Sequence, residues 1–98
     1  MSGGAFFTLT GVCTRDPGFS IYADGKIRKF DCCVVENDRN DKHSEAQFHN
    51  VIAYNGKADI LNELCGKGTK IVCNGKIRYR QEGNQKHTDL VIDWFEVL

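Results

Sequence analysis

Hydrophobic residues gather in five β-forming stretches, which are separated by polar and turn-forming segments. The predicted strands are residues 6–14, 26–35, 48–54, 69–80 and 88–98. A further short extended piece covers residues 20–23, between the turn-forming sequences RDPG and ADGK. Gly11 predicts a bulge or bend in the first strand, and a slip of the apolar phase between Ile27 and Phe30 predicts a bulge in the second.

One segment has a helical pattern instead. Residues 56–68, GKADILNELCGKG, carry an apolar stripe at helical spacing, made of Ala58, Ile60, Leu61, Leu64 and Cys65. The order of three strands, a helix and two strands predicts an all-β fold, a five-stranded OB-fold barrel with one helix between strands 3 and 4. A small α+β sandwich is the alternative. The length of 98 residues suits a single domain spanning residues 1–98.

The charges are balanced overall but not along the chain. The 13 basic and 13 acidic residues give a net charge of zero, so bulk electrostatics imply no anionic partner. Residues 67–86 are nevertheless basic, because they contain Lys67, Lys70, Lys76, Arg78, Arg80 and Lys86 against one acidic residue, Glu82. This stretch is either a local anion site or a solvated strand face. The polar segment 36–47 predicts an exposed, mobile loop.

Alternation sorts the side chains of the fourth strand onto two faces. Lys76, Arg78 and Arg80 project to one face, and Ile77 and Tyr79 project to the other. A strand that is basic on one face and apolar on the other can form a barrel wall and contact a phosphate backbone at once.

Phe48 and Tyr54 lie six residues apart in the third predicted strand and therefore share a face. On the wet face of a small barrel they would suit base stacking, which tolerates any sequence and contributes about 1–3 kcal/mol per base. Two core aromatics are the other interpretation. Asn50 and Ile52 lie on the same face as Phe48, so periodicity leaves both interpretations open.

The tetrapeptide GKIR occurs twice, at residues 25–28 and 75–78. The sequences that follow differ, KFDCCV after the first copy and YRQEG after the second, so the copies are not an internal repeat. Neither copy is a P-loop, because the spacing to the preceding glycine is too long and Ile follows the Lys. Both begin strands after a turn. The second copy continues into Arg78 and Arg80 within the basic stretch and is the stronger candidate for an anion site. Arg28 of the first copy faces a subunit interface or solvent.

The five cysteines, Cys13, Cys32, Cys33, Cys65 and Cys73, include no C-x-x-C pair and predict reduced, small core residues. A zinc site would have to recruit His43, His49 or His87 from scattered positions, so we expect no metal and no cofactor. Catalytic motifs are missing too, and a thiol- or metal-dependent hydrolase is the least implausible enzyme. We therefore expect no enzymatic activity.

No apolar run approaches the roughly 20 residues that span a bilayer. The N-terminal sequence MSGGAFFTLTG has neither the basic nor the apolar region of a signal peptide. We therefore expect no membrane partner and a cytoplasmic location.

Read together, these motifs resemble the bacterial and phage single-stranded DNA-binding protein family, from residue 7 to residue 98. LTGVCTRDP looks like the family's first strand and D-P turn, and YADGKIRKFDCCV resembles its hairpin and second strand. The most specific part is FHNVIAYNGKADILNELCGKGTKIVCNGKIRYR, residues 48–80. It is similar to the family's aromatic-His-x-Val strand, its helix, its Lys-Gly turn and its Gly-x-hydrophobic-Arg-x-Arg strand.

The resemblance implies an OB-fold, a homo-oligomer (a tetramer, less often a dimer) and sequence-independent binding of single-stranded DNA in replication, recombination or repair. It implies base stacking by Phe48 and Tyr54. It also implies contacts to the DNA backbone by Lys67, Arg78, Arg80 and Lys86, with Arg28 and Lys57 as weaker candidates.

Several departures from the family pattern predict weaker or more salt-sensitive binding. Glu82 stands where many relatives have a tryptophan, Asn50 where they often have a basic residue, and Asn37, Asp38 and Arg39 supply no aromatic. The chain also ends at DWFEVL, without the family's glycine-rich linker and acidic, partner-recruiting tail, which indicates a phage or mobile-element version or a truncated chain. An OB-fold replication-restart accessory protein, acting mainly through protein partners, is the alternative function.

Overall fold

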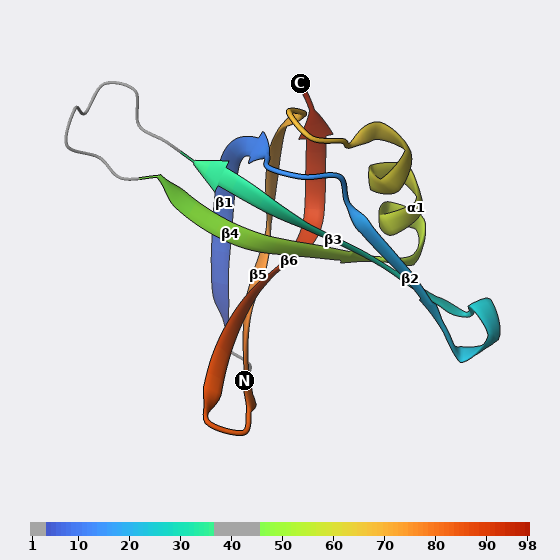
Figure 1. The fold of residues 1–98 in the computed structure, drawn as a ribbon, viewed down its shortest axis with the longest axis vertical. Helices are drawn as coiled ribbons and strands as arrows, with labels where there is room; N and C mark the ends of the chain where they lie inside the picture. The colour runs from blue at the N-terminus through green and yellow to red at the C-terminus, as the bar shows by residue number, and fades with distance from the viewer. Residues whose placement is uncertain (1–3, 37–45) are drawn as a thin grey trace.

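A computed structural model describes residues 4–36 and 46–98. The elements are β1 (Ala5–Cys13), β2 (Gly18–Tyr22), a 3-10 turn (Ala23–Gly25), β3 (Ile27–Glu36), β4 (Gln47–Tyr54), α1 (Asn55–Leu64), β5 (Lys70–Glu82) and β6 (Gln85–Val97) (Figure 1). The five predicted strands are confirmed, and the short extended piece is a sixth strand, β2, which pairs with β3. Most of the predicted polar loop, residues 37–45, lies outside the described residues, and so do Asn37, Asp38, Arg39 and His43.

The strands form one curved sheet in the order β1-β5-β6-β4-β3-β2, which closes because β1 also pairs with β3. The closing pairs are Val12 with Val35 and Cys13 with Val34. β1, β5, β6, β4 and β3 therefore make a closed barrel, and β2 extends the sheet beyond β3. α1 lies between β4 and β5, the third and fourth barrel strands along the chain. This arrangement confirms the predicted OB-fold.

Gly11 lies where β1 turns from β5 towards β3. A Cβ at this position would lie 2.5 Å from the Val35 carbonyl oxygen and 2.6 Å from a methyl carbon of Val34. A larger residue would therefore hold β1 away from β3 and oppose closure of the barrel. The bend predicted at Gly11 is thus a site of close approach between two strands.

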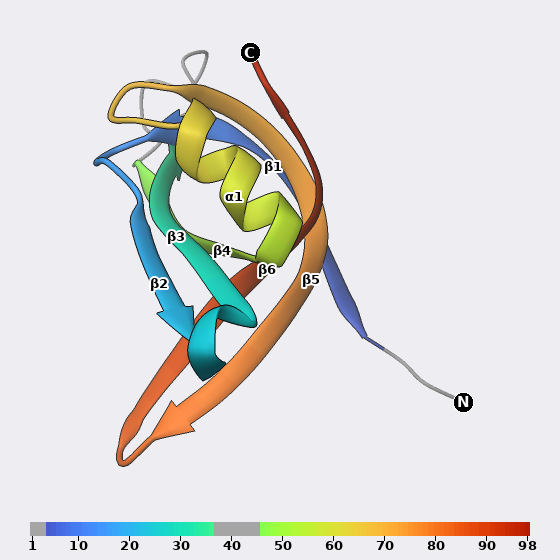
Figure 2. The ribbon, with the colours of Figure 1, turned by 90° about the vertical axis from the view of Figure 1, so that its right-hand side faces the viewer.

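The core lies between the barrel wall and α1, which packs against β3 and β4 (Figure 2). Large apolar side chains such as Phe30 are fully buried there, and each contributes about 1.5–3 kcal/mol to stability. Ala58 and Leu61 are the buried residues of α1. The predicted apolar stripe was too wide, because Ile60 and Leu64 are exposed and the helix meets the core along a narrower face.

The bulge predicted between Ile27 and Phe30 is wrong. β3 keeps a continuous register with β2 and β4 through this segment. Ile27 is an exposed residue on the outer side of the strand, whereas Phe30 faces the core, so no extra residue is needed to explain the phase. A register shift instead lies between β5 and β6, next to Gly75.

Candidate nucleic-acid interface

The outer surface of β4 carries the two predicted aromatics. Strand alternation directs Val51 and Ala53 into the core and leaves Phe48 and Tyr54 on the opposite face. Phe48 is 64% exposed near the start of the strand, and Tyr54 is partly exposed at its end. Neither belongs to the hydrophobic core, so the interpretation of the pair as core aromatics is wrong.

A buried carboxylate lies on the same face. Asp89 of β6 is 2% exposed and is opposite Arg78 in the β5–β6 register. Its Oδ2 accepts a hydrogen bond from Arg80 Nε at 2.7 Å and lies 3.6 Å from Arg78 Nη2. Asn50 Nδ2 donates to Oδ1 at 3.2 Å. Asp89 therefore links β4, β5 and β6 and holds two guanidinium groups on the outer face.

Arg78 connects this group to an aromatic ring. Its Nη2 donates to the Tyr54 hydroxyl at 3.0 Å, and its guanidinium carbon lies 5.9 Å from the centre of the Tyr54 ring. The side chains of Arg78 and Arg80 are both exposed. Two accessible cations and an aromatic ring thus meet on one face, which can bind both the phosphates and the bases of a nucleic acid.

Asp89 is held in its ionised form. Burial raises the pKa of Asp89, but the hydrogen bonds from Arg80 and Asn50 and the positive charges of Arg80 and Arg78 lower it further, so the pKa lies below its ordinary value. A group of this kind stabilises the fold at pH values above its pKa in the unfolded chain. That stabilisation is lost as the pH falls through the lower pKa of the folded state.

We expect Asp89→Asn to lower the free energy of unfolding at pH 7 by about 2 kcal/mol, the scale of hydrogen bonds to charged groups. The difference from wild type should shrink as the pH falls below about 4, where aspartate is protonated first in the unfolded and then in the folded state. Urea unfolding of both proteins at pH 7 and in acid measures this change. An equal difference at both pH values would contradict the ionised state of Asp89.

Arg28 has a different set of contacts. Its guanidinium makes two hydrogen bonds to the Asp59 carboxylate of α1, at 2.7 and 2.8 Å. This pairing raises the pKa of Arg28 and lowers that of Asp59. Arg28 therefore holds β3 to α1 and is not joined to the arginines of β5. Lys57 is exposed on the same helix.

Lys67 and Lys86 lie apart from the group formed by Tyr54, Arg78 and Arg80. Lys67 is exposed in the turn before β5, where its backbone N–H donates to Asp16 Oδ1 at 2.9 Å. Arg80 lies near the other end of β5. Lys86 pairs with Gln81 in the β5–β6 hairpin, one position away from the partner of Arg80, so its side chain leaves the hairpin on the opposite side from Arg80.

Of the eight predicted residues, the structure therefore gathers four on one outer face: Phe48, Tyr54, Arg78 and Arg80. Two members of the group, Asp89 and Asn50, were not predicted as site residues. The sequence signal for Asp89 was a charged residue directly before the apolar run LVI in a predicted strand. Alternation assigns Asp89 to a face of that strand, but it does not reveal that the carboxylate is buried and bonded to residues of β4 and β5.

Four of the five cysteines are core residues, as the sequence predicted, and Cys33 is the exception. Cys13, Cys32, Cys65 and Cys73 are buried free thiols, and Cys33 projects to the other face of β3 and is partly exposed. Burial raises the pKa of Cys73 to about 11, so its reactive thiolate is scarce near neutral pH. Within residues 4–36 and 46–98, no three His, Cys, Asp or Glu side chains form a group that could hold a metal ion.

The helix of the described region is too short and too polar to cross a membrane.

A solved structure supports the fold. The SSB domain of a protein from Synechococcus sp. is similar to this chain with a TM-score of 0.77, over 97% of each chain. The two sequences are 16% identical, so this similarity concerns the fold alone.

Two curated proteins are similar in sequence. The Single-stranded DNA-binding protein of Fusobacterium nucleatum subsp. nucleatum is 33% identical over 91 residues, which cover 86% of this chain and 59% of that protein. Single-stranded DNA-binding protein 1 of Xylella fastidiosa is 32% identical over 57 residues, which cover 54% of this chain and 42% of that protein. The chain thus spans less than two thirds of each relative's length.

The single-strand binding protein family matches residues 6–98, and the chain belongs to this family. The match includes all six strands apart from the first residue of β1, and it includes the whole outer face described above.

Proposed function

We propose that the chain binds single-stranded DNA without sequence preference, by stacking bases on Phe48 and Tyr54 and by neutralising phosphates with Arg78 and Arg80. The observation that carries this proposal is the grouping of Tyr54, Arg78 and Arg80 around the buried Asp89. Every base offers a flat π-face, so stacking does not select a sequence, and guanidinium groups pair well with phosphate oxygens. The family and the names of the relatives support the same conclusion.

We further propose that residues 1–98 act as one binding domain that protects single strands in replication, recombination or repair. The protein would work in the cytoplasm as a homo-oligomer, a tetramer or less often a dimer, without enzymatic activity. Lys67 and Lys86 would contact parts of the DNA backbone that extend beyond the group formed by Tyr54, Arg78 and Arg80. Arg28 and Lys57 are weaker candidates, because Arg28 is held to α1 by Asp59 and is not joined to the arginines of β5.

The salt dependence of binding tests this proposal. Each neutralised phosphate of a single strand releases counterions, so the logarithm of the association constant falls with the logarithm of salt concentration at a slope of about −0.7 per contact. We expect Arg78→Gln to make this slope less negative by about 0.7. Titration of fluorescent oligo(dT) at several NaCl concentrations gives the slope for each protein.

Lys26→Gln is the matched control, because it removes one positive charge from an exposed side chain that is not among the proposed contacts. Its slope should equal that of the wild type. Absence of saturable binding by the wild type at low salt would refute the proposed function. Equal slopes for wild type and Arg78→Gln would show that Arg78 does not contact phosphate.

A further inference from the structure

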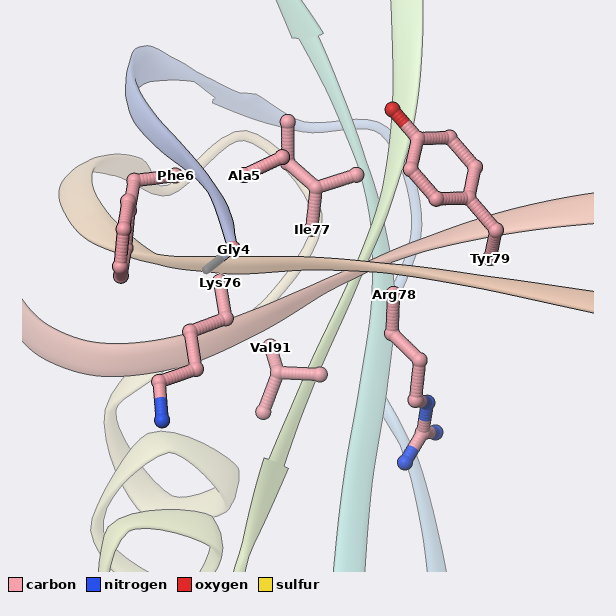
Figure 3. Close-up of a pocket in the computed structure, with 8 residues that line it drawn as sticks. All are labelled: Gly4, Ala5, Phe6, Lys76, Ile77, Arg78, Tyr79 and Val91. Carbon is pink, nitrogen blue, oxygen red and sulfur yellow. The ribbon is translucent and has the colours of Figure 1, made fainter. Parts of the chain in front are cut away.

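An acidic residue at the end of β5 lies in line with the two arginines of the proposed binding face. Side chains alternate along a strand, so Arg78, Arg80 and Glu82 project to the same side of β5. Figure 3 shows this alternation, because Arg78 points to one side of the strand and Tyr79 points to the other. The register of β5 with β6 is continuous through this stretch and ends with Glu82 opposite Gln85. Glu82 is therefore the next side chain after Arg80 on this face.

The Glu82 carboxylate contacts an arginine and a histidine. Its Oε2 lies 3.6 Å from Arg80 Nη1 and 3.5 Å from His87 Nε2. His87 is directly opposite Arg80 in the β5–β6 register, and opposite residues of an antiparallel pair project to the same face. The carboxylate is thus within ion-pair distance of Arg80, and His87 provides a second contact for it.

Asp89 and Glu82 approach different parts of the Arg80 guanidinium group. The buried Asp89 accepts a hydrogen bond from Nε at 2.7 Å. This bond leaves the two terminal nitrogens, Nη1 and Nη2, as the edge that can pair with two oxygens of a phosphate. Glu82 lies next to Nη1 of that edge. A phosphate that pairs with the terminal edge of Arg80 would therefore meet the carboxylate of Glu82 and not that of Asp89.

The charges on this face also cancel. Arg78 and Arg80 supply two positive charges, and Asp89 and Glu82 supply two negative charges, so the four side chains have no net charge. Asp89 is buried and hydrogen-bonded. Glu82 lies 3.6 Å from Arg80, which is beyond hydrogen-bonding distance. Glu82 is therefore the weaker of the two partners and the one that a phosphate can displace.

We propose that Glu82 lowers the affinity for single-stranded DNA by competing with the phosphates for Arg80. This inference rests on the proposed function and adds to it a residue that opposes binding. In the free protein the Glu82 carboxylate lies at the terminal edge of Arg80. In the complex a phosphate takes its place, while Asp89 continues to hold Nε. All of the contacts that support this inference lie within one chain.

Removal of the carboxylate should strengthen binding. Glu82→Gln and Glu82→Ala should each bind labelled oligo(dT) about 1.5- to 5-fold more tightly than the wild type at low salt, which is the scale of one exposed ion pair. Titration at about pH 8 keeps an ordinary histidine neutral. The gain should shrink at high salt, because screening weakens interactions between exposed charges. The Tm and the native mass of both variants should match those of the wild type.

A double-mutant cycle with Arg80 identifies the route of this effect. In an Arg80→Gln background the gain from Glu82→Gln should largely disappear, because the cation for which carboxylate and phosphate compete is absent. An equal gain in both backgrounds would overturn the inference, since Glu82 would then act by general repulsion of DNA. A gain in Glu82→Gln but not in Glu82→Ala would also overturn it, since the new amide would then be the cause.

Glu63→Gln is the matched control, because it removes one negative charge from an exposed residue of α1. Its affinity should equal that of the wild type, and a gain as large as that of Glu82→Gln would attribute the effect to net charge and overturn the inference. A changed native mass of the Glu82 variants would overturn it too, because altered assembly would then explain the affinity. If the wild type binds oligo(dT) and the Glu82 variants bind no more tightly, the inference fails and the proposed function stands. If the wild type does not bind at low salt, both fail.

Discussion

Replacing Gly75 with alanine is expected to destabilise the barrel by about 3 kcal/mol, the upper end of the range for overpacking. A Cβ at this position would lie 1.9 Å from the Val91 carbonyl oxygen and 2.8 Å from the Asp93 backbone nitrogen. Both atoms belong to the backbone of β6, next to the register shift with β5. No side-chain rotation can relieve this overlap, so the two strands would have to separate.

Thermal unfolding measures the effect. For a domain of this size each kcal/mol lowers the Tm by about 4–8 °C, so a decrease of roughly 12–24 °C is expected. Gly56→Ala in α1 is the matched control, because nothing lies within 4 Å of its Cβ and alanine favours a helix by about 1 kcal/mol over glycine. Its Tm should rise slightly. If Gly75→Ala unfolds at the same Tm as the wild type, β6 can move away from β5 with little loss of stability.

Removal of the aromatics from β4 is expected to have the largest effect on DNA binding. Phe48→Ala and Tyr54→Ala should each weaken binding by about 1–3 kcal/mol, the contribution of one stacked base. Because Phe48 is 64% exposed, Phe48→Ala should leave the Tm close to that of the wild type. Tyr54→Ala also removes the acceptor for Arg78. Tyr54→Phe retains the ring without the hydroxyl and so separates stacking from this hydrogen bond.

Fluorescence titration of oligo(dT) at low salt provides the affinities of these variants. Ile60→Ala is a suitable control, because Ile60 is an exposed apolar residue on α1, and its affinity should equal that of the wild type. If Phe48→Ala and Tyr54→Ala both bind like the wild type, stacking on β4 is excluded. If Tyr54→Phe binds as weakly as Tyr54→Ala, the contribution of Tyr54 comes from its hydroxyl and Arg78.

The strands and the helix could be predicted because each has a local signal, but the different roles of the two GKIR glycines could not. Gly25 and Gly75 begin the two copies of GKIR, yet the structure requires them for different reasons. Gly25 has a φ of +88° with nothing within 4 Å of its Cβ position, so only its backbone conformation favours glycine. Gly75 is required by the close approach of β6, which depends on a distant part of the chain.

The candidate site was predicted in pieces. Alternation placed Arg78 and Arg80 on one face of β5, and it placed Phe48 and Tyr54 on one face of β4. Whether these faces form one surface depends on the order β5-β6-β4 in the sheet, which no local pattern encodes. Asp89 was missed for the same reason, since its role follows from its position between those two strands.

The ladder of β1 determines when this strand can become part of the barrel. Ala5 pairs with Ile77, and Val12 pairs with Lys70, so nearly all partners of β1 lie on a strand that follows α1 in the chain. β2 pairs with β3 and β3 pairs with β4, which are neighbours along the chain, and β5 and β6 form a hairpin. Distant pairing must overcome the entropy of closing a long loop before it stabilises the fold, so it forms slowly. The β1–β5 ladder therefore cannot form before β5 is available, so β1 gains most of its pairing late in folding.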